Sequence, residues 1–181
     1  RAVTVREPFT GLTDIGGGVK VLGPSVEYYE SLIPDFDGMP EKAIATNALE
    51  SFFDKVAASI SRFFAIWGED QIDDDGVTSA KNNLSVITQL VFEGRRSVFT
   101  GDAGIQALDY AADQIEQCTS GAELRFMQIP HHGSKRNIGP TVLNRLVGEP
   151  IGQGSSRNIT AIASTAKNGE PKHPRKAVMN A

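Results

Sequence analysis

Short apolar runs alternate with amphipathic segments through the second half of the chain. The apolar runs are rich in β-branched and aromatic residues and are bounded by turn residues, which is typical of strands. The expected strands are 84–92, 97–100, 124–129 and 159–163, with a turn at 93–96. Apolar residues that recur every three or four positions predict helices at 103–118, near 140–146 and from Lys176 onward. Strands that alternate with helices predict an α/β fold.

The first half carries a short strand and two helical patterns. A strand is expected at 19–22, followed by a helix at 26–33 that Ser25 caps and Pro34 ends. Helical spacing with an aromatic stripe then runs through 41–67, as one helix or two. We interpret this stripe as a packing surface and the segment as a helical insertion between a core strand and the next hairpin. The acidic run Asp73-Asp74-Asp75 lacks the spacing of a calcium loop and is expected to be solvated.

Composition and charge narrow the class of protein. The chain has 181 residues, of which 40% are hydrophobic and 22% charged, as in one ordinary globular domain. No apolar run approaches the roughly 18 residues that a membrane helix needs, so no membrane segment is expected. The net charge of −4 argues against a surface that coats nucleic acid. A single cysteine, Cys118, excludes a disulfide framework and favours a reducing, cytoplasmic location.

The candidate chemistry lies just past the ends of the predicted strands. Asp102 follows one strand, His131 and His132 follow the next, and His173 comes after the last. Loops at the carboxyl ends of parallel strands converge on one rim, and imidazole and carboxylate together suit zinc, manganese or iron. Each residue alone also has a structural interpretation: Asp102 as a helix cap, the histidine pair as surface residues, and His173 as an exposed loop residue. Four such groups on one rim favour a metal site.

The order of these motifs is one found in a known superfamily. Asn82-Asn83-Leu84-Ser85-Val86 leads into a hairpin that ends in Thr100-Gly101-Asp102, and Pro130-His131-His132-Gly133-Ser134 and His173-Pro174 follow. From 82 to 181 the chain resembles the C-terminal half of the metallo-β-lactamase-fold hydrolases, in the branch related to the hydrolase domain of DNA-uptake competence proteins. The resemblance implies an αββα sandwich, present mainly as its second αβ half. The chain would be a single domain over 1–181, incomplete in its N-terminal half, because the superfamily's His-x-His-x-Asp-His motif is missing.

The resemblance also implies roles for the candidate residues. Asp102 would bridge two metal ions, zinc or manganese in the complete protein, and His173 would complete the second metal or touch a phosphate. His131 or His132 would coordinate a metal or donate a proton to the leaving group; we assign His131 as ligand and His132 as catalytic. The implied function is metal-dependent hydrolysis of a phosphodiester by an activated water, with a phosphate-containing substrate for which nucleic acid is one candidate.

Two rival functions belong to other classes. The chain could be a degenerate, non-catalytic relative that acts as a protein-interaction module, with the aromatic segment 41–67 as its partner surface. It could also be a nucleic-acid-binding module, but the acidic charge and the lack of interleaved aromatic and basic residues disfavour this alternative. Asn83 and Ser85 precede a strand and are expected to be turn and strand-ladder residues.

Overall fold

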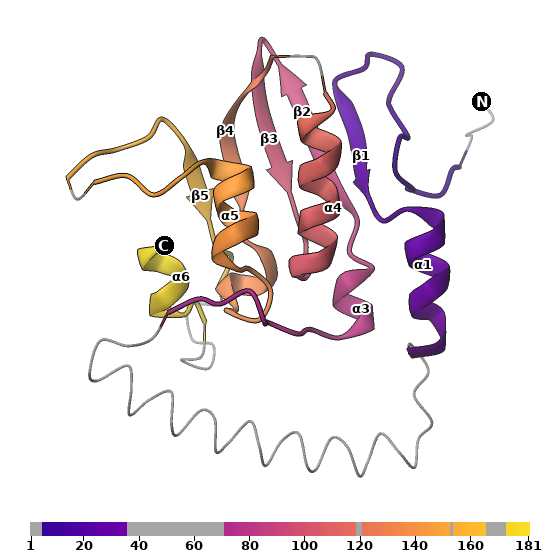
Figure 1. Ribbon diagram of the computed structural model, residues 1–181. Helices are drawn as coiled ribbons and strands as arrows, with labels where there is room; N and C mark the ends of the chain where they lie inside the picture. Colours follow the sequence, from indigo (N-terminus) through magenta and orange to yellow (C-terminus); the bar gives the residue numbers. More distant parts are fainter. Residues whose placement is uncertain (1–4, 36–70, 119–120, 153, 166–172) are drawn as a thin grey trace.

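The computed structural model describes residues 5–35, 71–118, 121–152, 154–165 and 173–181. The helical insertion predicted at 41–67 lies outside the described residues. The described strands form one five-stranded sheet, in which neighbours in sequence are also neighbours in space (Figure 1). The strands are β1 (Val19–Gly23), β2 (Ile87–Phe92), β3 (Arg95–Phe99), β4 (Glu123–Gln128) and β5 (Thr160–Ile162).

The sheet is mixed. The β1–β2 and β2–β3 pairs are antiparallel, whereas the β3–β4 and β4–β5 pairs are parallel. The helical elements are α1 (Val26–Leu32), η1 (Ile33–Asp35), α3 (Ala80–Asn83), α4 (Ile105–Glu116), η2 (Pro130–Gly133), α5 (Pro140–Val147) and α6 (Lys176–Asn180). The predicted α/β class is therefore confirmed. No helix in the described ranges is both long and apolar enough to cross a membrane.

Most predicted boundaries agree with the structure to within two residues, and the clearest difference lies before β2. The apolar run at 84–92 predicted a strand from Leu84, but β2 begins at Ile87. Ser79 caps the short helix α3, its side chain accepting a hydrogen bond from the Asn82 backbone N–H. Because the helix ends at Asn83, the residues that follow it connect the helix to the strand and are not part of the strand. The β2–β3 turn is the two-residue type, in which Glu93 and Gly94 both have positive φ.

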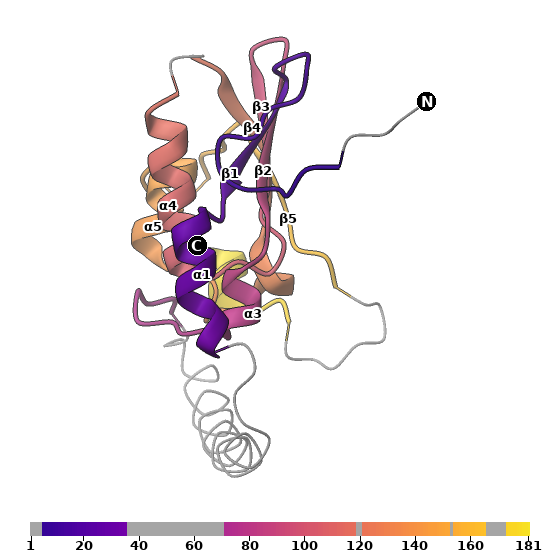
Figure 2. The same ribbon diagram turned by 90° about the vertical axis from the view of Figure 1, so that its right-hand side faces the viewer.

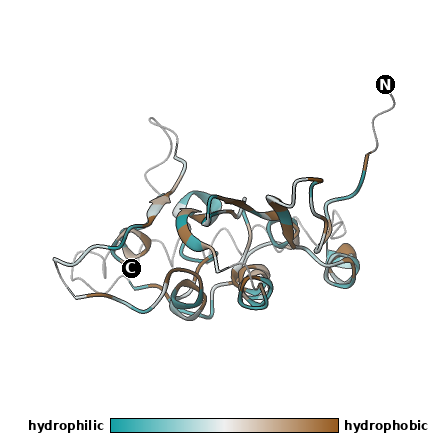
Figure 3. Ribbon diagram, turned by 90° about the horizontal axis from the view of Figure 1, so that it is seen from above, coloured by the Kyte–Doolittle hydropathy of each residue, from teal (hydrophilic) through white to brown (hydrophobic). Residues whose placement is uncertain are grey.

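Helices α4 and α5 pack on the same face of the sheet (Figures 2 and 3). Leu108 of α4 is fully buried in one cluster with Ile87, Val98 and Met127 of the central strands. Alternate residues of each strand point to this face, as the two-residue repeat of a strand requires. One layer of helices thus covers one face and encloses the core.

The opposite face of the sheet keeps apolar side chains exposed. Leu90 and Phe92 alternate with the buried residues of β2, and the Phe92 side chain is 67% exposed. On the neighbouring strands, the rings of Phe99 and Phe126 lie with their centroids 5.4 Å apart. Large apolar side chains on both faces are typical of a sheet that packs on two layers. Among the described elements, the layer of helices covers one of these two faces.

Candidate functional site

The parallel pairing of β3 and β4 brings two of the candidate loops together. Asp102 follows β3, and His131 and His132 follow β4 within the single turn η2. Since the two strands run in the same direction, their carboxyl ends meet at the same edge of the sheet. The backbone N–H of His131 donates to the carbonyl of Gly101, 3.1 Å away, and this bond fastens the two loops to each other.

All four predicted residues come together at this edge. Asp102 Oδ1 and His131 Nδ1 are 3.6 Å apart, and both side chains are partly exposed, 48% for Asp102 and 31% for His131. The ring centroid of His131 lies 5.8 Å from that of His132 and 6.0 Å from that of His173. His131 therefore sits at the centre of the cluster, within reach of the other three.

The backbone of the histidine pair is unusual. His131 and His132 have φ of +43° and +57°, in the left-handed region that non-glycine residues rarely adopt. Two consecutive left-handed residues turn the chain sharply after β4. Backbone conformations of this kind cost free energy and occur most often where function requires a particular side-chain placement.

His132 is oriented by the loop that follows β5. Its Nδ1 lies within hydrogen-bond distance of the carbonyl oxygen and the hydroxyl of Ser164. Because a carbonyl oxygen can only accept, this contact places the proton of the neutral ring on Nδ1 and leaves the lone pair on Nε2. A histidine held in this way is the usual form of a metal ligand or a general acid–base group.

His173 reaches the site because its loop packs against Gly133. The backbone N–H of Arg175 donates to the carbonyl of Gly133, 3.0 Å away. Gly133 has a φ of +81°, and a Cβ there would lie only 2.7 Å from the Cβ of Pro174. The close approach needs a glycine, which connects the Pro-His-His-Gly and His-Pro motifs physically.

Several polar residues support Asp102 and were not assigned this role from the sequence. The Ser85 hydroxyl accepts from the backbone N–H of Asp102 at 3.0 Å, so Ser85 is more than a turn residue. Gln128 Oε1 accepts from the backbone N–H groups of Thr100 and Gly101. The Asn137 side chain donates to the carbonyl of Asp102. Ser85 and Asn137 lie in loops, which have no periodicity, and Gln128 is the last residue of β4, so the sequence offered no signal for these contacts.

The chemistry of these side chains suits a divalent cation, but the described residues supply only part of a set of metal ligands. Asp102 Oδ1 and His131 Nδ1 are a carboxylate and an imidazole donor facing each other. Within the described ranges, no group of three or more His, Cys, Asp or Glu side chains is arranged to hold a metal ion. The described residues can therefore supply two facing donors, with His132 and His173 beside them.

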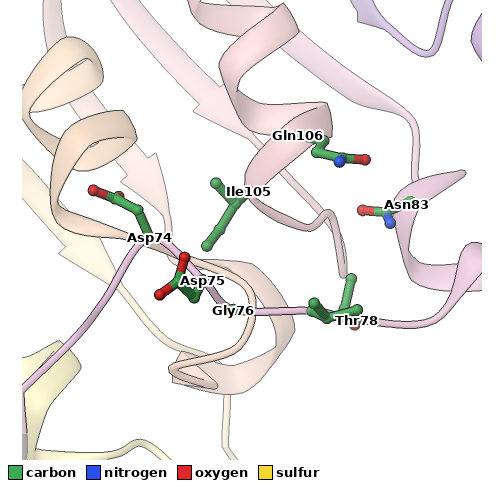
Figure 4. A pocket seen from close by; sticks show the side chains of 8 residues that line it. Asp74, Asp75, Gly76, Thr78, Asn83, Ile105 and Gln106 are labelled. Carbon is green, nitrogen blue, oxygen red and sulfur yellow. The ribbon is translucent and has the colours of Figure 1, made fainter.

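A cavity of about 310 Å³ lies beside this edge, at the start of α4 (Figure 4). Asp74 and Asp75 lie at one end of it, with Asn83 and Gln106 at the other. Asp73, Asp74 and Asp75 are exposed, as expected for a solvated acidic loop. The Asp74 carboxylate also accepts from the backbone N–H and the hydroxyl of Thr141. Asp74 thus caps the start of α5. None of the four predicted site residues lines this cavity.

We compared the chain with known proteins by sequence and by structure. No protein-family model matches it. No curated protein and no solved structure matches it either. The function is therefore inferred from the residues, their geometry and the motif resemblance.

Proposed function

We propose that this chain carries part of the active site of a metal-dependent hydrolase of the metallo-β-lactamase type. The observation that carries the proposal is the facing pair of Asp102 Oδ1 and His131 Nδ1 at 3.6 Å, with His132 and His173 beside it. A carboxylate and three imidazoles at the carboxyl edge of a parallel strand pair have the chemistry that such a centre requires.

Each residue has a distinct part in this proposal. Asp102, His131 and His173 would hold divalent cations, zinc or manganese, which supply an activated water and stabilise negative charge on the substrate. His132 has its Nδ1 occupied by Ser164, so its Nε2 is the atom that would exchange a proton with the leaving group. Further ligands would come from outside the described residues.

The proposed fold is the second half of an αββα sandwich. One face of the sheet packs on α4 and α5, while the other keeps Leu90, Phe92 and Phe99 exposed. A second sheet on that face would give the four-layer order of helices, sheet, sheet and helices. In this proposal residues 1–181 belong to one domain, and 41–67 is an insertion in it.

A phosphodiester is the substrate class that we propose. It follows from the motif resemblance, and the basic residues beside the histidines agree with it. Lys135 and Arg136 follow the His131–His132 pair, and Arg175 and Lys176 follow His173. Cationic side chains near a hydrolytic centre can attract and orient a phosphate.

The experiment is cation binding followed by turnover. Titration of the chain with Mn²⁺ or Zn²⁺, followed by calorimetry, should show binding that Asp102→Asn weakens at least about tenfold, because the amide is neutral and a poorer ligand. Asp75→Asn, which removes an acidic group outside the cluster, should bind as the parent does. The rate of hydrolysis of bis(p-nitrophenyl) phosphate should fall in Asp102→Asn as well. Equal cation affinity in Asp102→Asn and the parent would refute the proposal.

A second candidate function is that of a non-catalytic protein-interaction module. The observation that favours it is the exposed apolar face formed by Leu90, Phe92 and Phe99. The cation titration separates the two candidates. A folded chain that binds no cation, with the same calorimetric result for the parent and for Asp102→Asn, would favour the interaction module.

A further inference from the structure

Asn137 is a buried polar residue in the loop between η2 and α5. It is only 1% exposed, although it lies five residues after the exposed His132. Its Nδ2 is 2.9 Å from the carbonyl oxygen of Asp102 and 3.2 Å from that of Ala103. Carbonyl oxygens only accept, so the amide nitrogen must face them and the orientation of the side chain is fixed. Buried side-chain amides in folded proteins almost always have hydrogen-bond partners.

These bonds join the two loops that carry the candidate site. Asn137 belongs to the loop of His131, and its partners belong to the loop of Asp102. Within its own loop, the backbone N–H of Asn137 donates to Ser134, and that of Ser134 donates to His131. A continuous path of hydrogen bonds therefore runs from the backbone of His131 through Asn137 to the backbone of Asp102.

A second path reaches the ring of His131. Asn137 Nδ2 also lies 3.3 Å from Thr78 Oγ1, which is 2.6 Å from Asn82 Nδ2. Asn82 Nδ2 in turn lies 3.4 Å from Nδ1 of His131. The Thr78 hydroxyl thus connects Asn137 with the side chain that contacts the ring.

The packing around Thr78 leaves this arrangement little freedom. A Cβ on Gly104, at the start of α4, would lie 2.5 Å from Cγ2 of Thr78. A Cβ on Gly76 would lie 2.8 Å from the carbonyl oxygen of Arg136. The segment that contains Gly76 and Thr78 is therefore packed directly between the two loops. This segment cannot accommodate a change at Asn137 unless it moves.

We propose that Asn137 is a positioning residue that sets the place of Asp102 relative to His131. The buried Asn137 side chain acts on the site indirectly. It does so through its hydrogen bonds to the carbonyls of Asp102 and Ala103 and to the Thr78 hydroxyl. The part of this proposal that concerns cation affinity rests on the proposed function, whereas the part that concerns geometry does not. The two parts are tested by separate measurements.

The test uses Asn137→Asp, which keeps the size of the side chain and replaces its donor nitrogen by an oxygen. The oxygen repels the two carbonyls, so the loops should separate. Asn144→Asp is the matched control, because Asn144 lies on α5 and its side-chain amide donates to Glu149. Thermal unfolding of each variant is measured first. Thr78→Val, which keeps the β-branched shape and removes the hydroxyl, replaces Asn137→Asp if that variant does not fold.

Two readouts then distinguish a positioning role from a structural one. Without metal, the imidazole ¹H–¹⁵N resonances of His131 should shift in Asn137→Asp and stay unchanged in Asn144→Asp. With Co²⁺ as the probe, the affinity should fall about tenfold or more in Asn137→Asp, the size of effect seen when residues that orient metal ligands are changed.

The outcomes separate the two proposals. Unchanged His131 resonances in a folded Asn137→Asp variant overturn the positioning role, even when Asp102→Asn abolishes Co²⁺ binding. Shifted resonances in a chain that binds no Co²⁺ support the positioning role and refute the metal-dependent function.

Discussion

The contact between Gly133 and Pro174 gives the sharpest stability prediction, because both its geometry and its control lie in the described chain. Gly133→Ala adds a Cβ at a φ of +81°, where an L residue costs about 1–2 kcal/mol. The same Cβ would lie 2.7 Å from Cβ and 3.1 Å from Cα of Pro174. Proline atoms cannot rotate away, so relief of this overlap should cost about 1–3 kcal/mol more. We expect a total loss of about 2–5 kcal/mol.

Gly94→Ala separates the two contributions. Gly94 has a φ of +71°, and in the described part of the chain no atom apart from its sequence neighbours lies within 4 Å of the added Cβ. This variant should lose only the backbone cost of about 1–2 kcal/mol. Urea denaturation followed by circular dichroism gives the free energy of unfolding of both variants. Equal losses would refute the close packing of the His173 loop on Gly133, and with it the convergence of His173 on the site.

Two further predictions concern the surface of the fold. Phe92→Thr should change the free energy of unfolding by no more than about 0.5 kcal/mol, because Phe92 is 67% exposed, and a larger loss by urea denaturation would mean that this face is covered. Arg145 of α5 donates to Asp109, Asp113 and Glu116 of α4, and its hydrogen bond holds the pKa of Glu116 below the ordinary value of 4.5. Arg145→Met should therefore lower the midpoint of thermal unfolding at pH 7. The contribution of a lowered folded-state pKa is fully present above the unfolded value and is lost as the pH falls through the folded value, so this difference should shrink as the pH falls below 4.5. A difference that is the same at pH 3 and pH 7 would contradict the assignment.

Much of the local structure could be predicted from the sequence. Periodicity located the strands and helices of the second half, and Ser25 was correctly predicted to cap α1. The turn at Glu93-Gly94 was visible because glycine readily adopts positive φ. The candidate side chains could be chosen because histidines and an aspartate followed the strand ends. Local steric preferences and short-range hydrogen bonds decide these features, and both are carried by neighbouring residues.

The site geometry was decided by tertiary structure alone. The alternation of strands and helices predicted that the loops after β3 and β4 share one rim, but the 3.6 Å approach of Asp102 to His131 depends on how the packed elements place these loops. The hydrogen bonds of Ser85 and Asn137 to the backbone of the Asp102 loop join residues 17 and 35 positions apart. Such contacts depend on the core residues that pack the helices against the sheet. The sequence therefore determined which groups were available for chemistry, and long-range packing determined which of them meet.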